Sequence, residues 1–162
     1  MPLRIEPLTQ VHDHSEFDCG NDNLNTYLKN HALHHIKLGF GRTFVAVEDD
    51  DLRIVGYHTI APSSANWQDF PISVAKLAVP VLLLGRLAVD RTRQRDGIGR
   101  KLLRDSLKRA IEFAENNACF AVCLDAFNEE AKAYYSQYGF RELNDDPLHL
   151  FLPMKTVRKL NL

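Results

Sequence analysis

The sequence predicts one α/β domain over residues 1–162, a mixed β-sheet with helices packed on its faces. Three observations favour this class. The length suits a single domain that can bury a real core. The hydrophobic share of 45% and the charged share of 25% are ordinary for a globular protein. Apolar patterns of strand type and helix type alternate along the chain, as mixed α/β folds require.

The first half of the chain predicts a strand, a long helix and a hairpin. Apolar residues recur at helical spacing from Leu24 to Ile36, which indicates an amphipathic helix that Gly39 ends. The expected elements are a strand at 3–8, a helix at 22–38, and strands at 42–48 and 53–61 joined by a turn at 49–51. The polar stretch 62–80 is bounded by prolines and predicts a long active-site loop.

The second half predicts three further strands and two helices after an apolar central strand. Asn128 stands where it can cap the shorter helix. The expected elements are a strand at 81–90, a loop at 91–96, a helix at 97–116, a strand at 118–125, a helix at 129–138 and strands at 140–143 and 149–152. Strands and helices in this order predict a mixed sheet covered by helices.

Charge is spread unevenly along the chain. The net charge is −1, yet residues 85–109 contain nine basic and only three acidic side chains. A local positive field inside a mildly acidic protein indicates a bound polyanion, or else a solvated helix face.

Cysteine content and hydropathy exclude further classes of protein. Three cysteines exclude a complete disulfide framework. Cys119 and Cys123 would stand about 13 Å apart in one strand, beyond the roughly 7 Å that a disulfide spans, so we expect reduced thiols. No apolar run approaches the roughly 18 residues of a membrane span, and no apolar signal core follows Met1. We therefore expect no membrane contact and a cytoplasmic location.

The turn between the strand at 81–90 and the following helix carries the most chemistry. A helix N-terminus presents unpaired amides and a partial positive charge, which together bind phosphate. Gly97 and Gly99 allow a pyrophosphate to approach the backbone, and Arg95 and Arg100 can add charge-assisted hydrogen bonds. Tight helix–strand packing is the alternative reason for the glycines. The turn is neither a P-loop, because Gly-Lys-Ser/Thr is absent, nor a Rossmann fingerprint, because the third glycine is missing.

Two signatures here resemble those of the Gcn5-related N-acetyltransferases (GNAT). Residues 94–99, Gln-Arg-Asp-Gly-Ile-Gly, match the Gln/Arg-x-x-Gly-x-Gly/Ala motif of that superfamily and follow a similar strand, Leu87–Asp90. Residues 131–140 resemble its second signature, a helix that ends in Phe/Tyr-Tyr-x-x-x-Gly-Phe. The resemblance implies the GNAT fold: a mostly antiparallel sheet of about six to seven strands, splayed in the middle, with helices on both faces. It also implies acetyl-CoA as co-substrate.

The resemblance extends to one branch, the acetyltransferase toxins of bacterial toxin–antitoxin pairs. It is carried by segments 17–24, 41–45, 55–57, 79–90 and 124–126 and covers nearly the whole chain. It implies acetylation of the amino acid on aminoacyl-tRNA, a ribbon-helix-helix antitoxin as partner, and a homodimer. One departure is Arg95-Asp96, which replaces the usual small and basic pair and puts a negative charge near the expected pyrophosphate.

The same resemblance implies roles for individual residues. The amine attacks the thioester directly, the backbone amide of Val89 holds the developing oxyanion, and Tyr135 donates a proton to the departing thiolate. Tyr135 could equally be an aromatic packing residue, and Asn128 could be a helix cap alone. The expected cofactor-binding residues are Leu87, Ala88, Val89, Gln94, Arg95, Asp96, Gly97, Ile98, Gly99, Arg100, Asn128 and Tyr135. The expected substrate contacts are Arg42, Arg86, Arg91 and Arg93.

Two sets of alternatives stay open. His31, His34 and His35 have a spacing that can bind metal, but no acidic ligands accompany them, so we expect no metal and a solvated or tRNA-facing helix edge. For the function, the alternatives to a toxin are an N-acetyltransferase for a small-molecule amine or protein, and a non-catalytic CoA-binding module.

Overall fold

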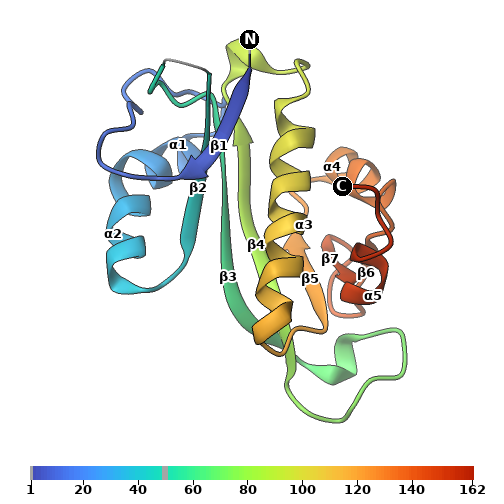
Figure 1. The fold of residues 1–162 in the computed structure, drawn as a ribbon. Helices are drawn as coiled ribbons and strands as arrows, with labels where there is room; N and C mark the ends of the chain where they lie inside the picture. Colours follow the sequence, from blue (N-terminus) through green and yellow to red (C-terminus); the bar gives the residue numbers. More distant parts are fainter. Residues whose placement is uncertain (1, 49–50) are drawn as a thin grey trace. The chain divides into compact units, whose positions relative to one another are not determined.

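The computed structural model describes residues 2–48 and 51–162, and Figure 1 shows the course of the chain. The predicted turn at 49–51 falls largely outside the described residues. The predicted order of strands and helices is confirmed. The strands are β1 (Leu3–Pro7), β2 (Arg42–Glu48), β3 (Gly56–Ala65), β4 (Val79–Val89), β5 (Ala121–Asp125), β6 (Arg141–Glu142) and β7 (His149–Pro153). The α-helices are α1 (Asp22–Thr26), α2 (Ala32–Leu38), α3 (Ile98–Asn116), α4 (Glu129–Ser136) and α5 (Met154–Val157).

Among the described residues the sheet has seven strands in the order β1-β2-β3-β4-β5-β7-β6. The pairs β1–β2, β2–β3, β5–β7 and β6–β7 are antiparallel, whereas β4 and β5 are parallel. The parallel register joins Val81–Leu83 to Ala121–Cys123, and β4 then continues to Val89. The mixed, mostly antiparallel sheet with helices confirms the predicted fold class.

The chain divides into two compact units, which are described separately. The first contains residues up to Ala61 together with Gly85–Ser106. Its strands bury both faces, because successive side chains of a strand point to opposite sides. Val45 and Val47 pack with the N-terminal helical segment, whereas Ala46 packs with Ile98 and Leu102 of α3. Helices therefore cover both faces of this part of the sheet.

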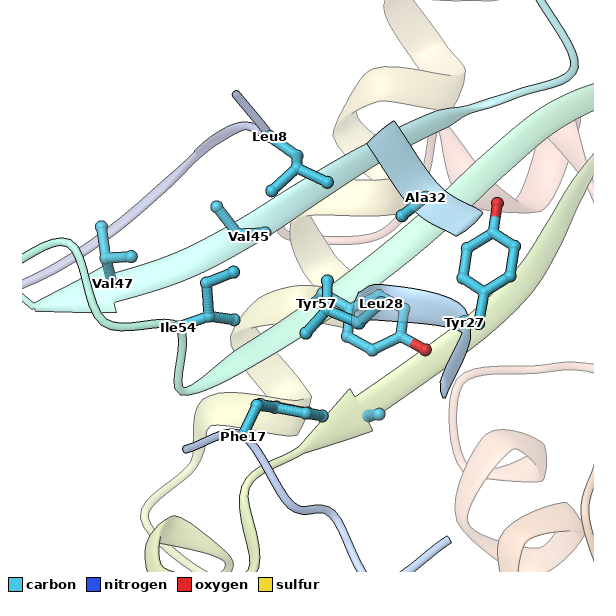
Figure 2. Close-up of a cluster of buried hydrophobic side chains, with 10 residues drawn as sticks. Leu8, Phe17, Tyr27, Leu28, Ala32, Val45, Val47, Ile54 and Tyr57 are labelled. Carbon is cyan, nitrogen blue, oxygen red and sulfur yellow. The ribbon is translucent and has the colours of Figure 1, made fainter. Parts of the chain in front are cut away.

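Figure 2 shows the cluster on the N-terminal helix side of the first unit. The Tyr57 ring is fully buried there, and its hydroxyl donates a 2.7 Å hydrogen bond to the carbonyl of Leu24. Phe17 meets the Tyr57 ring edge to face, with 5.7 Å between the centroids. The helical segment is thus held to β3 by apolar burial and by one hydrogen bond that satisfies the buried phenol.

The predicted helix at 22–38 is helical throughout, but it is not one regular α-helix. Asn21 caps α1 by accepting hydrogen bonds from the amides of Asn23 and Leu24. A π-helical turn at Tyr27–His31 then separates α1 from α2. Gly39, with φ of 80°, ends α2 in the left-handed conformation, as predicted.

The second unit contains Pro62–Leu84 and Leu107–Leu162. Its core is an aromatic and aliphatic cluster in which the Phe70 ring contacts both Phe120 and Phe151, at centroid distances of 5.6 and 5.1 Å. Cys123 is buried in this cluster, and burial raises the pKa of its thiol to about 12. Cys19, Cys119 and Cys123 are all free thiols, as expected.

Several predicted boundaries are wrong. The segment 62–80 is not one long loop, because β3 runs on to Ala65 and β4 already begins at Val79. The carbonyl of Pro80 accepts a 2.7 Å hydrogen bond from the amide of Phe120, so a proline that lacks a donor still joins the backbone hydrogen bonding. β3 begins at Gly56 rather than at Arg53, because residues 13 and 53 form an isolated parallel bridge.

The C-terminal helix α5 was not predicted. It is a single turn, too short to show helical periodicity in the sequence. Met154 and Val157 anchor it through buried side chains. No helix among the described residues is long and apolar enough to cross a membrane.

Candidate functional site

At the end of β4, successive side chains point to opposite faces of the sheet in the first unit. Leu87 and Val89 pack with Ile98 and Leu102 of α3. Ala88, on the alternate face, packs in the cluster with the N-terminal helical segment. The strand end is therefore held from both sides within this unit, which leaves its backbone in a fixed position.

Asp90, directly after β4, organises the loop that follows. The residue is 9% exposed, and its carboxylate accepts hydrogen bonds from the amide and the hydroxyl of Thr92, at 3.0 and 2.7 Å. It also accepts a 3.1 Å hydrogen bond from the amide of Asp18. Burial opposes ionisation, but the hydrogen bonds from Thr92 and Asp18 together hold the pKa of Asp90 below its usual value.

The Asp18 turn braces the same loop from the N-terminal segment. The carbonyl of Asp18 accepts a 2.9 Å hydrogen bond from the amide of Arg91. The Gln94 side-chain amide donates to the carbonyls of Val89 and Cys19, at 3.2 and 3.4 Å. Hydrogen bonds from the Gly20 amide and the Asn25 side chain lower the pKa of Asp18 itself. Two segments far apart in sequence thus hold residues 90–94 in one conformation.

The loop then turns sharply into α3. Arg95 has φ of 72°, a backbone conformation that residues other than glycine rarely adopt, and Gly97 has φ of 81°. Non-glycine residues in this region cost energy and gather at functional sites. The carbonyl of Gly97 accepts the first helical hydrogen bond, from the amide of Lys101, so the amides of Ile98, Gly99 and Arg100 lie in the unpaired first turn.

This helix start fits a pyrophosphate. A Cβ at Gly97 would meet nothing within 4 Å, and one at Gly99 would lie 3.6 Å from Val89 Cγ2, an ordinary contact. Tight helix–strand packing therefore does not require these glycines, and the backbone is open to a ligand. Arg95 and Arg100 are exposed beside it. Ile98 points its side chain into the core at 3% exposure, so only its backbone is available for binding.

The negative charge of Asp96 is paired within the loop. Its carboxylate accepts a 2.9 Å hydrogen bond from Arg93 Nε. Arg93 also forms an ion pair with Glu48. Arg93 is shared between two carboxylates, so it offsets only part of the charge that Asp96 would present to a phosphate, and it braces the loop against β2.

The other predicted substrate arginines differ in their surroundings. Arg42 is exposed at the start of β2. Arg91 lies in the short 3₁₀ turn Arg91–Arg93 with its side chain 66% exposed, 3.5 Å from the Asp18 carboxylate. Arg86, on β4, stacks over the Tyr27 ring with 3.5 Å between its guanidinium carbon and the ring centroid.

Two predicted site residues belong to the second unit. Asn128 caps α4 by accepting a 2.9 Å hydrogen bond from the amide of Ala131, so helix capping accounts for this residue. Tyr135 is half-buried and contacts the rings of Tyr134 and Phe140 edge to face. Burial raises the pKa of its phenol above the ordinary value. The first unit brings together Leu87–Val89 and Gln94–Arg100, whereas Asn128 and Tyr135 belong to the second unit.

Sequence reasoning missed Asp18 and Asp90 as organisers of the loop. An acidic residue directly after an apolar strand and two positions before a threonine was the available signal for Asp90, since aspartate commonly caps the next turn through its own backbone. Nothing local marked Asp18, whose partner lies 72 residues away. His31, His34 and His35 do not join any cluster of three or more potential metal ligands within the described residues.

Comparison with known proteins gives the same family in sequence and in structure. Residues 39–142 match the family model described as an acetyltransferase (GNAT) domain. The tRNA-acetylating toxin of Mycobacterium tuberculosis is 38% identical over 98% of this chain and 95% of its own. Two solved structures are similar. AtaT complexed with acetyl-methionyl-tRNAfMet has a TM-score of 0.91 and 25% identity, covering 99% of this chain and 100% of its own. A tyrosine-to-phenylalanine variant of AtaT, bound to the C-terminus of the antitoxin AtaR and acetyl-CoA, has a TM-score of 0.83 and 26% identity, covering 97% and 96%.

The helix start offers unpaired amides to a phosphate-rich ligand, and the family match extends over residues 39–142. The protein belongs to the GNAT acetyltransferase family.

Proposed function

We propose that this acetyltransferase uses acetyl-CoA to acetylate the amino acid carried by aminoacyl-tRNA, and that it acts as a toxin. The single observation that carries the cofactor part is the braced turn at Arg95–Arg100, with open glycines and unpaired helix amides. The acceptor part is supported by the M. tuberculosis relative, which is named a tRNA-acetylating toxin, and by AtaT, solved with acetyl-methionyl-tRNA.

In this proposal the loop and the helix start bind acetyl-CoA. The amides at Gly97–Arg100 hold the pyrophosphate, and Arg95 and Arg100 add charge-assisted contacts. Gln94 and Asp96 shape the turn through their hydrogen bonds to Val89 and Arg93. The backbone of Leu87–Val89 hydrogen-bonds the extended arm as an added strand would. AtaT, a relative of similar fold, has been solved with acetyl-CoA.

Acetyl-CoA supplies an acetyl group activated as a thioester. The Val89 amide donates to the thioester oxygen as negative charge develops on it. Tyr135 supplies the proton for the departing sulfur. A phenol with an ordinary pKa near 10 is protonated at neutral pH, the state that a donor needs, and burial raises the pKa of Tyr135 further. An α-amine with an ordinary pKa near 8 is partly neutral at pH 7 and can attack without a dedicated base.

The acceptor side is built from basic residues in the first unit. Arg86, Arg91 and Arg42 are the proposed contacts to the RNA, since sequence-independent RNA binding depends largely on phosphate charge. Aminoacyl-tRNA as acceptor places the reaction in the cytoplasm. We further propose an antitoxin as partner, because AtaT is solved with AtaR, and a homodimer as the assembly.

The test is incubation of the protein with acetyl-CoA and total charged tRNA, followed by mass spectrometry of the released amino acids. Acetylated amino acids from one or a few tRNA species are expected, together with growth arrest when the protein is expressed alone. Tyr135→Phe should lower kcat by roughly 100-fold with little change in either KM. Acetylation of polyamines or peptides but not of charged tRNA would replace this acceptor with a small amine or a protein. Acetyl-CoA binding without any turnover would indicate a CoA-binding module.

A further inference from the structure

The Arg86 side chain lies over the ring of Tyr27, a member of the buried cluster of the first unit. Its guanidinium carbon lies 3.5 Å from the centroid of the Tyr27 ring. Tyr27 is only 8% exposed, so the ring is fixed by the surrounding core. Figure 2 shows Tyr27 at one end of the buried cluster, with its hydroxyl directed away from Leu28 and Tyr57. A cation placed over an aromatic face is attracted by the ring's electrons and loses freedom.

His35 holds the Tyr27 ring in turn. A hydrogen bond of 3.1 Å joins the Tyr27 hydroxyl to His35 Nδ1, and the two rings meet edge to face at 5.3 Å. His35 also stacks with His31 at 6.0 Å and contacts the exposed Phe40 ring at the same distance. Two of the three histidines that stood out in the sequence, His31 and His35, therefore contact Tyr27, which in turn lies under Arg86.

The π-helical turn makes this arrangement possible. Tyr27 is the first residue of the turn, and His31, its last, has φ of −126°, far from the usual helical value. The turn carries one residue more than an α-turn, so Tyr27, His31 and His35 fall on one side of the helix. A regular α-helix would rotate His35 away from Tyr27. Such π-turns occur frequently at functional sites.

Arg86 is half-buried, and the Tyr27 ring leaves its guanidinium donors uncovered. The guanidinium donors lie in the plane of the group, so a ring beneath its face does not cover them. Those donors match the oxygens of a phosphate in bidentate fashion. Arg86 directly precedes Leu87–Val89, the strand end proposed to hold the acetyl-bearing arm, and by strand alternation it points to the opposite face from Leu87.

We infer that Tyr27 and His35 are positioning residues that hold Arg86 for a phosphate near the reactive end of the acceptor. The inference rests on the proposed function, because it needs an acceptor that carries phosphates. Tyr27 and His35 act through Arg86 and do not touch the reacting atoms.

The test measures steady-state kinetics with aminoacyl-tRNA and acetyl-CoA for wild type, Arg86→Ala, Tyr27→Leu, Tyr27→Phe and His35→Ala, with the exposed neighbour His34→Ala as control. Tyr27→Leu should raise KM for aminoacyl-tRNA on the order of tenfold and leave KM for acetyl-CoA unchanged. Tyr27→Phe keeps the ring and should cost about two- to threefold, as should His35→Ala. His34→Ala should match wild type.

Two further readouts separate positioning from a general loss of structure. Arg86→Ala and Tyr27→Leu should both flatten the salt dependence of KM for aminoacyl-tRNA by about one phosphate contact. The double variant Arg86→Ala/Tyr27→Leu should match Arg86→Ala alone, because Tyr27 then has nothing to position. If Tyr27→Leu does not fold, His35→Ala carries the test. Its two- to threefold rise in KM for aminoacyl-tRNA should disappear in the Arg86→Ala background.

The outcomes are distinct. If wild type acetylates charged tRNA and the Tyr27 and His35 variants keep its KM and salt dependence, this inference alone is overturned. Additive losses in the double variant would overturn it as well. If wild type leaves charged tRNA unmodified, the proposed function fails and the inference fails with it.

Discussion

The buried carboxylate of Asp90 accepts a 3.1 Å hydrogen bond from the backbone amide of Asp18. The same carboxylate receives the amide and hydroxyl of Thr92, so one side chain joins the N-terminal turn to the start of the loop before α3. The loop that carries Arg95 in a strained conformation is therefore anchored at its first residue. The strain at Arg95 can persist because the surrounding hydrogen bonds determine the path of the chain.

Asp90→Ala should weaken acetyl-CoA binding. The substitution removes the acceptor for three hydrogen bonds, so the loop loses its anchor. The amides at the start of α3 are then no longer held in a fixed position. KM for acetyl-CoA should rise on the order of tenfold, and the free energy of unfolding should fall by about 2 kcal/mol. Thr92→Val, which removes only the hydroxyl, is the milder control. A variant with unchanged KM for acetyl-CoA would show that the loop holds its shape without Asp90.

Gly56→Ala should destabilise the first unit. An added Cβ would lie 2.9 Å from Leu102 Cδ1 and 3.1 Å from the Ala88 carbonyl, both inside van der Waals contact. Overpacking of this kind costs roughly 1–3 kcal/mol, measurable by urea unfolding. Gly41→Ala is the matched control, because its Cβ would meet its nearest atom at 3.5 Å. Equal stability of the two variants would mean that α3 shifts away from β3 at no cost.

His58→Ala should lower the free energy of unfolding by more than the loss of side-chain volume alone would. His58 is fully buried, its Nε2 lies 2.8 Å from the Asp105 carboxylate, and its ring stacks on Phe44. The variant loses the ring that stacks on Phe44. It also removes the histidine partner of the Asp105 carboxylate, whose side chain is 20% exposed. The free energy of unfolding should fall by roughly 3 kcal/mol. A double-mutant cycle with Asp105→Asn checks the pair, and additive losses would argue against coupling.

His149 should make the protein less stable as pH rises above the ordinary pKa of histidine. A hydrogen bond to Asp145, then the charges of Asp125, Asp145 and Asp146, raise the pKa of His149 above 6.5. Since the folded pKa exceeds the unfolded value, the extra stability is fully present below about 6.5 and is lost as pH rises through the folded pKa.

The effect should stay below about 1 kcal/mol, because the His149 side chain is 36% exposed and solvent screens its charge. Urea unfolding of wild type and His149→Gln at pH 5.5 and 8.5 measures it. The difference between the two proteins should be largest at the acidic end. A wild-type advantage that grows towards pH 8.5 would contradict the sign of this prediction.

Local patterns determined the element order, the helix caps and the place of the glycine-containing turn at Gln94–Gly99. Asn128 caps α4 and Gly39 ends α2, because caps depend on a few neighbouring residues. The Gln94–Gly99 turn could likewise be recognised, since its glycines and its position between strand and helix lie within one short stretch. Boundaries at Pro62 and Arg53 were wrong because strand pairing, not local preference, set them.

Only the tertiary structure decided what surrounds that turn. Asp18 meets Asp90 and Tyr27 lies under Arg86 because separate strands and loops pack together, and no short pattern encodes a contact between distant residues. The π-helical turn at Tyr27–His31 looks like ordinary helix in the sequence, since both forms show nearly the same apolar spacing. The sequence by itself therefore determined the family and the position of this turn between strand and helix. Packing decided which side chains brace the turn and hold Arg86, because long-range contacts depend on the whole fold.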